Sequence, residues 1–125
     1  MPKAGEIRSK SSLVTDLKTL ERIMDSFYDV FAKDVNVFTS VVSDLLSMVP
    51  VFGYAVSGVS VTQTLSSSEK INYSKAAYET LRTAYRAMAN GEANSVSIFQ
   101  DFVWVYQGKN KQYWKLTGRL TTILD

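Results

Sequence analysis

The stretch "SVSIFQDFVWVYQG", residues 95–108, decides the fold class because it fits two structural patterns at once. Val96, Phe99, Val103 and Tyr106 recur at the three- and four-residue spacing of a helix face. The run FVWVY inside it also has the composition of a buried strand, and periodicity does not separate the two in so short a run. Because the segments on both sides favour helices, we predict a helix here.

The segment that follows, "QYWKLTGRLTTIL", residues 112–124, is separated from that stretch by Gly108 and the polar run GKNK. Its apolar positions fit one face of a helix. These positions are Tyr113, Leu116 or Thr117, Leu120 and Leu124. The sequence therefore predicts a last helix at the end of the chain.

The clearest helix of the chain is "EKINYSKAAYETLRTAYRAMA", residues 69–89. Ser66, with Glu69 three residues later, forms a capping-box pattern that opens it. Several alanines raise its helix propensity, and Asn90-Gly91 supplies a stop signal. We expect the helix to run between these two signals.

Residues 11–31, "SSLVTDLKTLERIMDSFYDVF", carry an apolar stripe at alternating steps of four and three. The stripe consists of Leu13, Leu17, Leu20, Met24, Phe27 and Phe31. Ser11 or Ser12 would cap this helix, and Asp16 would lie in its first turn, where a carboxylate is favoured. The sequence thus predicts an amphipathic helix packed on a core.

The same apolar spacing resumes after one polar interruption at Asp34. Asp34 or Asn36 can cap a second helix that ends near Val49, because Pro50 disfavours helix in the residue before it. Beyond Pro50 the small and β-branched residues permit a strand, but we predict a third, short or irregular helix. We expect the two helices on either side of Asp34 to be tightly joined.

Taken together, the sequence predicts an all-α fold, a compact bundle of five or six short helices with antiparallel neighbours. At 125 residues one domain is the default. We assign residues 1–11 to a basic N-terminal arm and residues 12–125 to a single helical domain.

Composition argues against catalysis. The chain has no cysteine and no histidine, so it lacks the most common general acid–base group and the most common zinc ligands. The pattern from Ser67 to Lys70 matches that of some serine acyl enzymes, but a helix-capping role for this serine run is the better interpretation. We therefore expect no catalytic residue, no cofactor, no metal site and no small-molecule substrate.

Basic charge is concentrated in the N-terminal arm and in the C-terminal half, although the net charge is only +2. In the tail, lysines alternate with tryptophans and tyrosines, a combination that binds nucleic acid through phosphates and stacked bases. The alternative is that the aromatic residues are core and the lysines keep a turn in solvent. The candidate nucleic-acid contacts are Lys3, Arg8, Lys10, Arg82, Arg86, Lys109, Lys111, Lys115 and Arg119.

A central stretch, residues 45–68, has no charged side chain. Its small residues would let another backbone approach closely, which favours a packing surface between helices or between subunits. The candidate self-association residues are Val49, Val51, Phe52, Gly53, Ala55, Gly58 and Val59. Insertion of residues 45–65 into a membrane is a less favoured alternative, because Pro50, the glycines and the hydroxyls weaken their hydrophobicity.

These observations predict a non-enzymatic, self-associating structural or assembly protein, coat-like or scaffold-like, whose basic ends contact a DNA or RNA backbone. Its main partner would be another copy of itself. The alternatives are a soluble helical protein-binding module, such as an adaptor or toxin-neutralising protein, and a membrane-active protein. With no signal-peptide pattern at the start, we expect an intracellular location or a place within an assembled particle.

Overall fold

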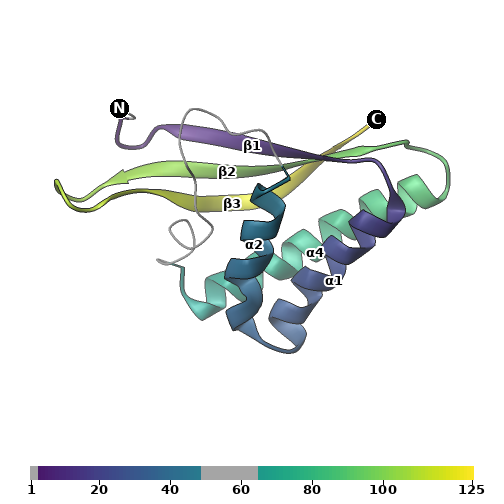
Figure 1. Ribbon diagram of the computed structural model, residues 1–125, viewed down its shortest axis with the longest axis horizontal. Helices are drawn as coiled ribbons and strands as arrows, with labels where there is room; N and C mark the ends of the chain where they lie inside the picture. The colour runs from purple at the N-terminus through teal and green to yellow at the C-terminus, as the bar shows by residue number, and fades with distance from the viewer. Residues whose placement is uncertain (1–2, 49–64) are drawn as a thin grey trace.

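The computed structural model describes residues 3–48 and 65–125, and this part of the chain forms a three-stranded antiparallel sheet with helices packed on one face (Figure 1). The strands lie in the order β1-β2-β3, so each is hydrogen-bonded to its neighbour in sequence order. In chain order the elements are β1 (Ile7–Val14), α1 (Leu17–Ala32), the 3-10 helix η1 (Val35–Val37), α2 (Phe38–Leu46), α4 (Ser67–Ala89), β2 (Val96–Tyr106) and β3 (Gln112–Leu124).

The prediction of an all-α bundle is wrong. In the stretch 95–108, which fitted both a helix and a strand, residues 96–106 form strand β2. Residues 112–124, predicted as the last helix, form strand β3. From Val96 to Phe102 burial along β2 alternates residue by residue, which is the period of a strand with one face on a core. Pairing with β1 on one side and β3 on the other satisfies the backbone of β2, and its β-branched and aromatic side chains suit that position.

The N-terminal segment also differs from its prediction. Residues 7–11, expected in a basic arm, belong to β1, and the helix expected from the serines begins only at Leu17. The Asp16 carboxylate caps α1 by accepting a hydrogen bond from the Thr19 amide at 2.9 Å. Ser12 instead lies in β1, where its hydroxyl donates to the Leu45 carbonyl of α2 at 3.2 Å.

The local signals for α4 and for the break before α2 are confirmed. Ser66 and Glu69 form both hydrogen bonds of the capping box at the start of α4, each at 3.1 Å. At the other end Asn90 is the C-cap, and Gly91 has a φ of 76°, the left-handed conformation that favours glycine after a helix. Asp34 caps the break before α2 by accepting from the Asn36 amide at 3.0 Å.

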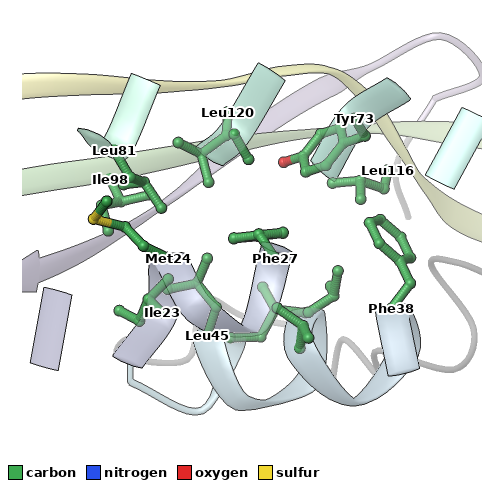
Figure 2. Close-up of a cluster of buried hydrophobic side chains, with 14 of the residues drawn as sticks. Ile23, Met24, Phe27, Phe38, Leu45, Tyr73, Leu81, Ile98, Leu116 and Leu120 are labelled. Atoms are coloured by element: carbon green, nitrogen blue, oxygen red, sulfur yellow. The ribbon is translucent and has the colours of Figure 1, made fainter. Parts of the chain in front are cut away.

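The core lies between the sheet and helices α1, α2 and α4, as Figure 2 shows. Tyr73 of α4 belongs to this core, with ring centroids 6.3 Å from Phe27 and 5.7 Å from Phe38, the latter in an edge-on arrangement. The Tyr73 hydroxyl accepts a hydrogen bond from the Gln100 amide of β2 at 3.0 Å. Burial raises the pKa of Tyr73, and the Asp101 charge adds to this while the Gln100 bond opposes it.

These contacts define the two faces of the sheet. The inner face carries Ser12 and Gln100, whose side chains bond α2 and α4. Because neighbouring residues of a strand point to opposite faces, Leu13 and Phe99 belong to the outer face. Helices α1, α2 and α4 pack on the inner face of the sheet (Figure 1).

Candidate nucleic-acid interface

The β2–β3 hairpin extends past the end of β1 and forms an arm, residues 105–113 (Figure 1). The β1 register stops at the Ile7–Val103 pair, whereas β2 and β3 remain paired to Tyr106 and Gln112. Beyond Trp104 the arm therefore has two strands only. We call residues 105–113 the hairpin arm.

The tip of the hairpin arm presents two lysines. The Gln107 amide donates to the Lys111 carbonyl at 2.8 Å, and the Lys111 amide donates to the Gly108 carbonyl at 3.0 Å, which closes the turn. Lys109 and Lys111 are both exposed on it. Since residues 102–124 contain no Asp or Glu, no carboxylate of the hairpin arm offsets these charges.

The start of the chain lies at the same end of the sheet. The Gly5 amide donates to the Trp104 carbonyl at 2.9 Å, and the Trp104 amide donates to the Glu6 carbonyl at 2.9 Å. These two bonds fix the chain immediately after Lys3 against the base of the hairpin arm. Lys3 is exposed, so its ammonium group adds to the positive end formed by the two tip lysines.

The aromatic residues of the tail divide into a packed pair and an exposed tyrosine. Trp104 and Trp114 pack edge to face with centroids 5.2 Å apart, and Trp114 is buried while Trp104 packs partly buried against the core. Tyr106 is 53% exposed on the hairpin arm. The indoles thus anchor the base of the arm, and Tyr106 is the ring best placed to stack on a base.

Lys115 and Arg119 lie together elsewhere, in a cleft of about 340 Å³ between the first half of α4 and β3. The cleft follows from a bulge: between Phe99 and Asp101, β2 has one residue while β3 has three. Glu69 lines the opposite wall. Hydrogen bonds from Ser66 lower the pKa of Glu69, and the positive charge of Lys115 lowers it further.

Two of the predicted contacts lie on β1. Lys10 is only 6% exposed, on the inner face beside the Gln100 pair position, and burial lowers its pKa. Arg8 is half-buried and its Nε lies 3.1 Å from a carboxylate oxygen of Glu6. Both groups are therefore engaged with this chain rather than displayed with the tip lysines.

The remaining predicted contacts, Arg82 and Arg86, are exposed on the last turns of α4. Figure 1 shows that this end of α4 leads to the start of β2, at the opposite end of the sheet from the hairpin tip. The structure therefore brings Lys3, Lys109 and Lys111 together and leaves the two arginines apart from them.

The predicted self-association residues at 49–59 lie outside the described residues, and so does most of the 45–65 membrane candidate. Leu45 and Leu46, at its start, are core residues of α2. Within residues 3–48 and 65–125, no helix combines the length and apolar character needed to cross a bilayer.

One surface was missed by the sequence interpretation. Ile7 and Leu13 of β1 are exposed, although Leu13 had been counted in a helical stripe. The signal was present in "IRSKSSLV", residues 7–14, where apolar residues at both ends share a strand face with the serines at 9 and 11. The same face continues to Ile123 on β3.

Searches of protein-family models, curated proteins and solved structures give no match to this chain. Its candidate interface is therefore argued from its own residues.

Proposed function

We propose that this protein is a non-enzymatic, self-associating structural subunit that contacts a nucleic-acid backbone with its hairpin arm. One observation carries the proposal: Lys109 and Lys111 are exposed at the tip of an arm that reaches past β1, in a stretch without a carboxylate. Lys3, at the base of the arm, has the same sign of charge.

The chemistry of such an arm suits phosphates. Each lysine that neutralises a phosphate releases condensed counterions, so the affinity falls as salt rises, whatever the base sequence. A two-stranded ribbon is also narrow enough to enter the major groove of a duplex. Because Trp114 is buried and Trp104 packs on it, backbone contact is better supported than stacking along a single strand.

The non-enzymatic part of the proposal is supported by the absence of cysteine and histidine from the sequence. The self-associating part is supported by apolar side chains on the outer face of the sheet, where Ile7 is 64% exposed and Leu13 is 60% exposed. Apolar surface left in contact with water on a sheet is characteristic of a surface that meets another protein.

The test compares matched pairs of charge-neutralising variants. Lys109→Gln with Lys111→Gln removes the tip charges, and Lys18→Gln with Lys75→Gln removes two exposed helical lysines. Binding to a labelled duplex is followed by fluorescence anisotropy at several salt concentrations. We expect the tip pair to weaken binding and to reduce the salt slope by about 2, and the helical pair to change little.

An equal effect of the two variant pairs would contradict a specific role for the hairpin arm, and a wild-type chain that does not bind at low salt would overturn the nucleic-acid function. A third pair, Arg82→Gln with Arg86→Gln, measures whether the far end of α4 contributes. Because these arginines lie apart from the tip, we expect a smaller change in slope than for the tip lysines.

A further inference from the structure

The outer face of the sheet is a continuous, mostly uncharged surface. The register places Leu13, Ser97 and Ile123 in one row across the three strands, and Ile7, Val103 and Lys115 in another. Leu13 is 60% exposed and Ile123 is 56% exposed, although both are large apolar residues. Exposed apolar side chains gathered on one face of neighbouring strands form a patch rather than scattered contacts with water.

Strand β2 adds apolar side chains between these two rows and within one of them. Phe99 and Val103 of β2 share the outer face and are partly exposed, since the described helices pack on the opposite face. Asp101 is the one acidic group of the outer face, and the Ser9 hydroxyl donates a hydrogen bond to that carboxylate from the neighbouring strand. The acidic group of the face is therefore already hydrogen-bonded within the sheet.

The area of the face is sufficient for a contact with a second copy. The three strands have 8, 11 and 13 residues, and at ~3.3 Å per residue and ~4.8 Å between strands they cover roughly 500 Å². Two such faces in contact would therefore cover roughly 1,000 Å². That is the lower bound for a specific protein–protein interface.

We propose that the outer face is the self-association surface and that its occupant is the same face of a second copy. This inference rests on the proposed self-association and names its surface. Two sheets packed face to face about 10 Å apart would give a four-layer arrangement with the helices of each copy outside. The contact is closed by two-fold symmetry, because the same patch is used by both copies.

The charges on the face fit such a contact. A two-fold axis across the strands can set the Asp101 row of one copy against the Val103 row of the other. The two Asp101 carboxylates are then not opposite each other, which avoids repulsion between like charges across the contact. Lys115, on the edge strand β3, lines the cleft opposite Glu69.

The closing experiment changes the exposed row without touching the core. Leu13→Lys with Ile123→Lys places two ammonium groups on the face, and exposed edge-strand lysines are compatible with a folded sheet. The matched control is Ala32→Lys with Ala89→Lys, which adds the same charge at exposed ends of α1 and α4. Sedimentation equilibrium of the full chain, free of nucleic acid, measures the dimer dissociation constant, and circular dichroism confirms the fold.

We expect the wild type to dimerise, the Leu13/Ile123 variant to raise the dissociation constant about tenfold or more, and the control to leave it unchanged. A second measurement reads the face directly. Because the chain has no cysteine, Ser11→Cys introduces one thiol on the outer face, and Ser68→Cys one on α4. Maleimide labelling at Ser11→Cys should slow as the protein concentration rises, whereas labelling at Ser68→Cys should not.

The outcomes separate the two claims. A dimer that is insensitive to the Leu13/Ile123 variant, with a Ser11→Cys thiol that stays reactive, overturns the outer face as the surface and leaves self-association standing. A wild type that is strictly monomeric at high concentration overturns self-association and this inference together. In both cases the hairpin-arm proposal is judged separately, by the salt slope.

Discussion

Helix α4 and the β2–β3 hairpin follow one another in the chain, yet they are specified in different ways. The ends of α4 are fixed by residues within the helix or next to it, namely Ser66 with Glu69 at the start and Asn90-Gly91 at the end. The strands of the hairpin are fixed by partners: β2 lies between β1, some ninety residues earlier in the chain, and β3. A local signal can be recognised in a single sequence, and a pairing between distant segments cannot.

The largest test of this contrast is Phe102→Ala in the centre of β2. Phe102 is fully buried against the helices, so its truncation leaves a cavity and should cost about 3–5 kcal/mol of unfolding free energy. Urea denaturation measures the loss. Leu81→Ala, equally buried in α4, is the matched control and should cost about 2–5 kcal/mol. A loss under about 1 kcal/mol for Phe102→Ala would mean that the hairpin is not held by the core.

The next effect concerns the bulge that shapes the cleft. Gly118 has a φ of 68°, and a Cβ there would meet no atom within 4 Å, so Gly118→Ala is strained by its backbone conformation alone. We expect a loss of about 1–2 kcal/mol by thermal or urea unfolding. Gly118→Asn should lose less, because asparagine tolerates the left-handed region. Equal losses for both substitutions would point to a cause other than φ.

A smaller effect is expected at the start of α4. Ser66→Ala removes the hydroxyl that accepts from the Glu69 amide and should cost about 1 kcal/mol. Ser68→Ala, in the first turn but outside the capping box, is the control and should be close to neutral. If Ser66→Ala lowered the unfolding free energy more than Phe102→Ala, the cap of α4 would contribute more to stability than the packing of the hairpin. That result would contradict the difference between α4 and the hairpin.

The smallest effect is the pH dependence of the same cap. Because the pKa of Glu69 is lowered in the folded chain, chiefly by its hydrogen bonds with Ser66, its carboxylate favours folding. That contribution is complete above the unfolded pKa of about 4.3 and is lost as pH falls through the folded value. Glu69→Gln keeps a capping-box side chain and removes the titration. The stability difference between wild type and variant should therefore shrink from about pH 6 to about pH 3, and a constant difference would contradict it.

The helical half of the fold was predictable because its signals are local. The Asp34 cap before α2 and both ends of α4 appear where the sequence places them. The first helix forms as well, but it begins at Leu17 with Asp16 as its cap, and not at Ser11 or Ser12. Leu13 is an exception. Its spacing fits the helical stripe, but the residue lies in β1 and its side chain is exposed on the outer face. Spacing alone does not reveal which neighbour satisfies the backbone.

The basic residues of the candidate interface show the same difference between local signals and distant pairing. Lys109 and Lys111 share one turn, so their proximity follows from the sequence whichever element precedes them. Lys10 shares their charge but is buried on the inner face, and Arg82 lies at the other end of the sheet. Their separation depends on the pairing of β1 with β2 and on the direction of α4, which no local pattern encodes.

The sequence by itself determined the Asp34 cap, both ends of α4 and the basic run of residues 102–124 without a carboxylate. Only the tertiary structure decided that residues 96–106 and 112–124 are strands and that the tip lysines stand on an arm. It also decided that one sheet face is left apolar and exposed. The physical reason lies in the backbone hydrogen bonds of a short apolar run. In a helix the run forms these bonds within itself, and in a strand it forms them with segments distant in the sequence. Only the complete set of strand pairings shows which of the two structures forms.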